Sequence, residues 1–327
     1  MDQEVLVAGE TLIDFIPERP GPLSDVEGFE RRPGGAPANV AAGLSLLERP
    51  PLFWTRVGDD PFGRYLEGVL DSVGLPDRFV ERDSDAKTTL AFVTHDETGE
   101  RTFSFYRDGT ADTRLEPGTI DDDVLEALEW VHAGGVALAS GSSRAATLDL
   151  LERASEAGST VSFDPNARPE LWPDDETFAR VVREALVHVD VCKATVEELE
   201  ALGFPGSDPE SAARAAIGAD DGPHTIFLTR GGEGAVAVAG SDSPWGDRAE
   251  PTAVEHPGYD VDVVDTTGAG DAFLAGAIAS LRSGRGLEGA LSRANAVAAL
   301  TTTDAGAMSA LPDREALEAF LADADAA

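Results

Sequence analysis

The chain has 327 residues, with 61 acidic and 25 basic side chains and a formal net charge of −36. This charge argues against nucleic acid or an anionic membrane as a partner, and its even spread is typical of a halophilic cytoplasmic protein. The sequence shows no signal-like start, no apolar run long enough to span a membrane and a single cysteine, so we expect a cytoplasmic protein without an intramolecular disulfide.

The first predicted elements bring a carboxylate close to a glycine-rich helix start. Residues 4–9 form a buried strand, and Asp14 lies in the apolar stretch that follows. Asp14 is either a surface carboxylate or a group that binds two sugar hydroxyls. Residues 33–39 (PGGAPAN) are either a plain helix start with proline near the first turn or a loop that approaches a polyol. In the second interpretation, Gly34 and Gly35 let the backbone come close, and the Asn39 amide donates to and accepts from hydroxyls.

Two later strands differ in character from the rest of the chain. Residues 88–94 and 101–107 are rich in β-branched and aromatic side chains, with a turn at 96–99 (DETG) between them. They predict a small sheet that stands off the main body. We interpret segments of about 14–32 and 86–112 as a lid inserted in a single domain of residues 1–327. The edges and apolar faces of such a sheet suggest a homodimer formed through the lid.

From about residue 121 onward, helices and strands alternate. The expected helices are 121–128, 145–157, 175–187, 196–202 and 209–217, and the expected strands are 130–136, 160–164, 189–193, 224–229 and 234–239. This alternation predicts an α/β fold with a Rossmann-like, doubly wound, mostly parallel sheet covered on both faces. Ligands of such sheets bind at the carboxyl ends of the strands.

Several polar residues and glycines fall at these strand ends. They are Asp164, Asn166, Arg168, Lys193, Thr229, Arg230, Gly231, Gly232 and Gly234. The segment 164–168 is also a turn signal by itself, and a hairpin turn explains the glycines at 231–234. Arg230 suits a phosphate better than a structural turn, because its guanidinium can bind two oxygens at once. Arg107, at the end of the predicted hairpin, and Arg168 are the candidate cations near a substrate.

The most informative segment is 264–273 (VDTTGAGDAF). A strand is expected at 259–264 and an apolar helix from 272 onward, which places Asp271 at a strand-to-helix turn. Unpaired amides at a helix start bind anions, and a carboxylate beside them can accept a hydroxyl proton. Phosphoryl transfer to an alcohol needs this combination. Alternatively, Asp271 is only a helix-start carboxylate that the helix dipole favours.

Together these segments resemble the ribokinase-like (PfkB) family of carbohydrate kinases. Two signature regions of that family match residues 34–39 and 265–273, and the likeness runs nearly from end to end. Within the family the chain looks most like a fructokinase, through matches at 9–15, 33–41, 58–63, 103–107, 164–168 and 171–173. The resemblance implies a Rossmann-like body with a β-sheet lid. It also implies transfer of the ATP γ-phosphate to a hydroxyl of a hexose, with fructose favoured.

The resemblance also implies roles for individual residues. Asp271 would be the base, and the amides of Gly268, Ala269 and Gly270 would form an anion hole. The sugar would be faced by Asp14, Gly34, Gly35, Asn39, Arg107, Asp164, Asn166 and Arg168. The ATP site would be lined by Lys193, Thr229, Arg230, Gly231, Gly232, Gly234 and Asn295. Mg²⁺ would arrive with ATP, and K⁺ would bind near Asp265 and the turn at Gly306.

The chain departs from the family at an Asn-x-x-Glu element that helps to position magnesium through water. Lys193 stands at the Asn position, as in fructokinases, and Val196 stands at the Glu position. A neighbouring carboxylate, Glu197 or Glu198, would have to substitute, and we take Glu197 as the candidate. Lys193 is one of two lysines in the chain, which favours a phosphate-binding role over a solvated one.

Other functions remain open at this point. A 2-keto-3-deoxygluconate kinase is the nearest alternative, because Arg107 or Arg168 could bind the carboxylate of that substrate at two points. A phosphosugar kinase is less favoured, since residues 34–39 offer no lysine for a second phosphate. From another class, a sugar-binding regulatory protein could keep the fold without the chemistry, but the intact 268–271 segment argues against it.

Overall fold

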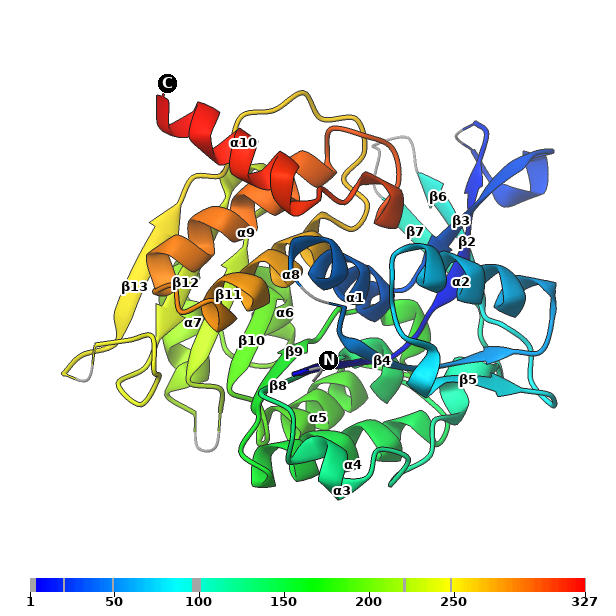
Figure 1. Ribbon diagram of the computed structural model, residues 1–327, viewed down its shortest axis with the longest axis horizontal. Coiled ribbons are helices and arrows are strands. Elements are labelled where there is room, and N and C mark those ends of the chain that lie inside the picture. The colour runs from blue at the N-terminus through cyan, green and yellow to red at the C-terminus, as the bar shows by residue number, and fades with distance from the viewer. Residues whose placement is uncertain are drawn as a thin grey trace.

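Nine strands form one sheet through the middle of the molecule (Figure 1). The computed structural model describes residues 4–19, 21–48, 50–95, 101–219, 222–247 and 249–326. The strands of the large sheet are β1 Val5–Ala8, β4 Leu52–Gly58, β5 Val80–Asp83, β8 Trp130–Gly134, β9 Thr160–Asp164, β10 Val191–Thr195, β11 Thr225–Thr229, β12 Ala235–Ala239 and β13 Thr252–His256. They lie in the order β13-β12-β11-β10-β9-β8-β1-β4-β5.

The sheet is mostly parallel, as predicted. All neighbours from β11 to β5 in this order pair in parallel, whereas β12 and β13 pair antiparallel at one edge. Both faces are buried: Leu6 of β1 belongs to the core on one side of the sheet, and Val7 belongs to the core on the other. Strands buried on both faces are continuously apolar, which is the pattern that β1 shows in the sequence.

Helices cover each face of the sheet (Figure 1). One layer contains α1 Ala36–Leu47, α8 Ala269–Arg282, α9 Leu287–Thr301 and α10 Arg314–Ala326. The other layer contains α4 Ser143–Glu156, α5 Asp175–Leu186, α6 Val196–Ala201 and α7 Pro209–Ile217, with the short α3 Asp122–Leu125 beside α4. Among the described residues, the structure contains no helix with the length and apolar character of a membrane span.

A separate four-stranded sheet lies beside the large one, at its β4 side (Figure 1). It consists of β2 Leu12–Pro17, β3 Phe29–Gly34, β6 Leu90–His95 and β7 Arg101–Tyr106, in the order β3-β2-β6-β7. Helix α2 Pro61–Ser72 packs below it, because Leu66 joins Ile13 and Val57 in a small apolar cluster. The β6–β7 hairpin confirms the predicted strand pair, whereas the turn predicted at 96–99 lies outside the described residues.

Two predicted elements differ from the structure. The helix expected at 121–128 is reduced to α3, Asp122–Leu125. The strand expected at 259–264 is wrong: the neighbouring strand is β13, and the chain from 257 to 264 is irregular. Val263 and Val264 are 60% and 64% exposed, so the alternating pattern there does not mark a buried face. Asp271 therefore follows a loop instead of a strand.

Candidate functional site

The glycine turn before α8 positions Asp271. Gly268 precedes the helix with a φ of 75°, and a Cβ at this position would lie 2.5 Å from the Cβ of Ala307. Glycine is therefore needed for the turn. Asp271 lies in the first turn of α8, where no described side chain caps the helix. The amide of Ala269 contacts the Thr266 carbonyl at 3.3 Å, whereas the next amides have no partner within the helix.

Asp271 is buried and meets a side chain from the other signature region. Asn39, in the second turn of α1, donates through Nδ2 to Asp271 Oδ2 at 2.8 Å. Burial raises the pKa of Asp271 from 3.8 to about 6, although the hydrogen bond from Asn39 acts in the opposite direction. A carboxylate with a raised pKa is a stronger proton acceptor when it is ionised. The geometry thus provides a base at a helix N-terminus.

A buried ion pair lies next to this turn. Lys193 of β10 donates through Nζ to Asp164 Oδ2 of β9 at 2.9 Å, and both side chains are buried. Burial by itself would lower the pKa of Lys193, but the carboxylates of Asp164 and Glu198 outweigh it and raise the pKa above its ordinary value. A Cβ on Gly270 would lie 3.1 Å from Lys193 Nζ. A permanent positive charge is therefore placed beside the free amides of α8.

A cavity of about 110 Å³ opens in front of Asp271. It is lined by Glu10, Leu12, Asp14, Gly35, Ala36, Asn39, Phe103, Phe105, Val136, Asn166, Arg168, Thr267, Gly268 and Asp271. Five residues that the sequence predicted at the sugar are therefore brought together here: Asp14, Gly35, Asn39, Asn166 and Arg168. The small sheet contributes Phe103 and Phe105, whose rings stack with centroids 5.6 Å apart. Arg168 lies over the Phe103 ring, 5.1 Å from its centroid.

Three buried side chains of this cavity have an oxygen without a hydrogen-bond partner in the described structure. They are Glu10 through Oε2, Asn39 through Oδ1 and Asn166 through Oδ1. Buried polar atoms are almost always paired, and an unpaired one costs about 1–3 kcal/mol. Three such oxygens around one cavity indicate a ligand with several hydrogen-bonding groups. Glu10 lies in the 9–15 segment that resembles fructokinases, but the sequence predicted no role for it, because a single acidic residue after a buried strand does not show what its side chain contacts.

Two further residues predicted at the sugar support the cavity without lining it. A Cβ on Gly34 would lie 2.0 Å from Asp14 Oδ2, so any other residue here would displace that carboxylate. Asp164 accepts from the backbone amide of Asn166 at 3.0 Å as well as from Lys193. Asn166 has a φ of 43° and is the one non-glycine residue with positive φ in the described chain. The turn at 164–166 thus aims Asn166 into the cavity.

Arg107 is placed differently from the prediction. It does not line the cavity; it is buried and donates through Nε to Asp112 Oδ2 at 2.7 Å. Asp112 also accepts from Thr89 and Thr110. The charge of Arg107 is therefore largely balanced within the protein. This leaves Arg168 as the arginine that faces the cavity.

Apart from Lys193 of β10, the residues predicted at the nucleotide lie at the carboxyl end of β11 and in α9. Gly231 and Gly234 have φ values of 59° and 76°, and a Cβ on Gly234 would lie 2.0 Å from a backbone oxygen. Gly232 lies between them in the same short turn. Thr229 ends β11, and Arg230 forms an ion pair of 2.7 Å with Glu255. Asn295 is buried and donates to the Leu291 carbonyl.

Asp265 was predicted to lie beside a monovalent cation, and Glu197 was predicted to contact magnesium through water. Asp265 accepts from the Thr267 amide through Oδ1 and from the Gly306 amide through Oδ2, at 2.9 Å each, so it joins the two loops expected there. Glu197 is exposed, whereas Glu198 is buried and accepts from the amides of Ala167 and Thr195. The described residues include no group of three or more His, Cys, Asp or Glu that could hold a metal ion.

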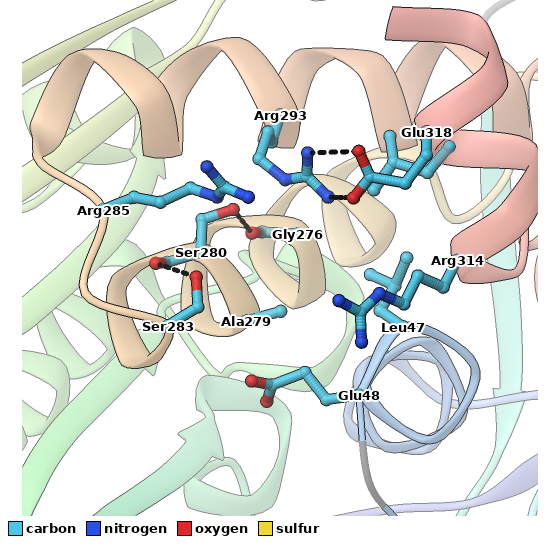
Figure 2. A pocket seen from close by; sticks show the side chains of 11 residues that line it. Leu47, Glu48, Gly276, Ala279, Ser280, Ser283, Arg285, Arg293, Arg314 and Glu318 are labelled. Carbon is cyan, nitrogen blue, oxygen red and sulfur yellow. Dashed lines mark hydrogen bonds and ion pairs between the residues drawn. The ribbon is translucent and has the colours of Figure 1, made fainter.

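A second cavity, of about 80 Å³, lies between α8, α9 and α10 (Figure 2). The guanidinium groups of Arg285, Arg293 and Arg314 face the space between these helices (Figure 2). Arg293 contacts both carboxylate oxygens of Glu318, at 2.5 and 3.3 Å, and so ties α9 to α10. None of the residues with expected chemistry lines this cavity, and we assign no reaction to it.

The model of the pfkB family carbohydrate kinases matches residues 2–314. A probable fructokinase-4 from Arabidopsis thaliana is 36% identical over 325 residues, which cover 96% of this chain and 95% of that protein. A fructokinase from Vibrio alginolyticus is 34% identical over 324 residues, which cover 97% of this chain and 99% of that protein.

Among solved structures, one similar chain is a fructokinase double mutant from Vibrio cholerae O395, in a form bound to fructose, ADP and a potassium ion. It has a TM-score of 0.80 and 32% sequence identity, and 98% of each chain is covered. The similarity therefore extends over both sheets of the present structure.

Proposed function

The chain belongs to the pfkB family of carbohydrate kinases, and from this premise we propose that it transfers the γ-phosphate of ATP to a hydroxyl of fructose. The observation that carries the proposal is the buried Asp271, held by Asn39 at the N-terminus of α8 and open to a polar cavity. The similarity to fructokinases over nearly the full chain favours fructose as the sugar.

The geometry suggests how the reaction proceeds. The sugar would bind in the cavity through the free oxygens of Asn39 and Asn166, with Arg168 and Asp14 at its walls. Ionised Asp271 accepts the proton of one sugar hydroxyl, and that oxygen forms a bond to the γ-phosphorus. The bond from this phosphorus to the β–γ bridging oxygen breaks, and ADP leaves. Charge on the transferred group is stabilised by the amides at the start of α8 and by Lys193.

We propose that the nucleotide and its cations bind around this turn. The glycine turn at 231–234 and Asn295 would line the ATP site, and Thr229 and Arg230 lie at the same strand end.

Because the described residues offer no cluster of protein ligands, we propose that Mg²⁺ is held mainly by phosphate oxygens and water. For contact with that water shell we propose Glu198 in place of Glu197, because Glu198 is buried and its charge acts on Lys193, whereas Glu197 is exposed. K⁺ would bind beside Asp265 and Gly306.

Arg107 bears on the choice of acceptor. A 2-keto-3-deoxygluconate kinase needs a cation for the carboxylate of its substrate, and Arg107 is already paired with Asp112. Arg168 alone would then have to bind that group. The balance of charge in the cavity therefore favours an uncharged sugar such as fructose.

The proposal is tested by measuring ADP release with Mg-ATP in molar KCl. We choose this salt concentration because the acidic composition predicts a halophilic cytoplasmic enzyme. The acceptors are fructose, 2-keto-3-deoxygluconate, ribose and fructose 1-phosphate. We expect turnover with fructose. Turnover with the keto-acid alone would reassign Arg168 as a carboxylate-binding residue, and no turnover with any acceptor would favour a binding protein.

The acidity of Asp271 predicts the pH dependence of this reaction. Only the ionised carboxylate can accept the hydroxyl proton, and burial raises its pKa to about 6. We therefore expect kcat/KM for fructose to fall by about tenfold per pH unit below pH 6. Circular dichroism at each pH shows whether the protein stays folded. A folded protein whose kcat/KM stays constant down to pH 5 would contradict this assignment.

The small sheet is proposed to act as a lid and as a dimer contact. Its β7 strand sends Phe103 and Phe105 into the cavity, which supports the role of a lid. Rings on the opposite face, from Phe92 and Tyr106, lie 5.4 Å apart, and Tyr106 is 64% exposed. Light scattering in molar KCl should give twice the chain mass of 34.2 kDa, and Tyr106→Asp should reduce it. A wild-type monomer would contradict the dimer.

A further inference from the structure

Glu10 is a buried acid in the cavity to which neither the sequence nor the comparisons assign a role. It lies between β1 and β2, and its side chain is 2% exposed. Oε1 accepts from the amide of Ala36, the first residue of α1, at 3.3 Å. Oε2 has no hydrogen-bond partner in the described structure. One oxygen thus anchors the helix that carries Asn39, and the other has no hydrogen-bond partner among the described residues.

We propose that Glu10 is a sugar-binding residue whose free Oε2 forms a hydrogen bond with a hydroxyl of the acceptor, while Oε1 holds the first turn of α1. This inference rests on the proposed function and deepens it, because it adds a contact that selects the substrate. A purely structural role explains the contact with Ala36. It does not explain why the second oxygen is buried and unpaired on a side chain that lines the same cavity as Asp271.

The charges around Glu10 show which chemical group suits it. Burial raises the pKa of Glu10 to about 7, with smaller contributions in the same direction from Asp112 and Asp271, although Arg107 favours the ionised form. Asp14 and Arg168 line the same cavity from β2 and from the turn after β9. Both protonation states of Glu10 are therefore populated at neutral pH. A hydroxyl can pair with either state, because it donates to a carboxylate and accepts from a carboxylic acid.

The contact is tested by combining variants of Glu10 with sugars that lack one hydroxyl. Glu10→Ala should raise the KM for fructose about tenfold with little change in kcat, which corresponds to one buried hydrogen bond. Glu10→Gln keeps one acceptor and one donor, so its KM should stay within about threefold of the wild type. Glu156→Gln, at an exposed position at the end of α4, is the matched control.

The KM of wild type and of Glu10→Ala is then measured for the four monodeoxy fructoses that retain the phosphorylated hydroxyl. Each pair of protein variant and sugar analogue forms a cycle like a double-mutant cycle and shows which hydroxyl Glu10 contacts. For the analogue that lacks the hydroxyl bound by Glu10, wild type and Glu10→Ala should have the same KM. An equal penalty with every analogue, or no penalty with fructose, would overturn the inference but leave the kinase activity in place. Absence of turnover by the wild-type protein would overturn the proposed function and this inference together.

Discussion

Replacing Asp271 by asparagine is expected to reduce kcat at least about 100-fold and to leave the protein folded. The amide has the shape of the carboxylate, and it still offers an oxygen to Asn39 Nδ2, which lies 2.8 Å from Asp271 Oδ2. It cannot take the proton of the sugar hydroxyl. The measurement is steady-state turnover with fructose and Mg-ATP in molar KCl. Asp123→Asn, at an exposed position in α3, is the control.

Stability provides an independent check on the same variant. The folded-state pKa of Asp271 is raised to about 6 from 3.8, so the unfolded chain releases this proton at lower pH than the folded one. Ionisation of Asp271 therefore destabilises the folded state increasingly between about pH 4 and pH 6, and by a constant amount above. A neutral amide removes this cost, so Asp271→Asn should melt at the same temperature or higher at pH 7. Full activity in the folded variant would remove Asp271 from the mechanism.

Lys193→Met is expected to lower the free energy of unfolding by about 3–5 kcal/mol. The substitution keeps most of the volume of the side chain but leaves Asp164, which is buried, without its cation. The loss is measured by urea unfolding in molar KCl, because urea leaves the ionic strength unchanged. Turnover should fall as well, since the positive charge beside Gly270 is lost.

The double variant Lys193→Met with Asp164→Asn separates the two effects. It removes the uncompensated buried charge, so part of the stability should return while turnover stays low. Arg64→Met is the matched control, because its ion pair with Asp59 is about half exposed and is worth at most about 1 kcal/mol. If Lys193→Met and Arg64→Met have equal effects on unfolding, the buried pair does not stabilise the fold.

Sequence reasoning succeeded where the signal is local. The alternation of strands and helices predicted the parallel sheet, because periodicity and turn residues report directly on backbone conformation and burial. The same reasoning failed at 259–264, where an alternating pattern occurs without a neighbouring strand. Strand formation depends on a partner, and β12 pairs there with β13 instead. Glycines such as Gly268 were predictable, because few other residues fit a turn of that geometry.

The composition of the site depended on contacts between distant segments. Asn39 and Asp271 are 232 positions apart, and their hydrogen bond exists because α1 and α8 pack side by side on one face of the sheet. The sequence predicted Arg107 as a cation near the substrate, and its pairing with Asp112 in the buried interior became visible only in three dimensions.

The sequence by itself determined the fold class, because periodicity along the chain reports on local conformation. It also determined the two signature turns and Asp271 as the expected base, because each of these is encoded in a short run of residues. The tertiary structure decided that Lys193 is held by Asp164, that Glu198 is buried where Glu197 is exposed, and that Glu10 faces the cavity. Burial and charge balance set these properties. Both are sums over all neighbouring elements, so no single segment of the chain carries them.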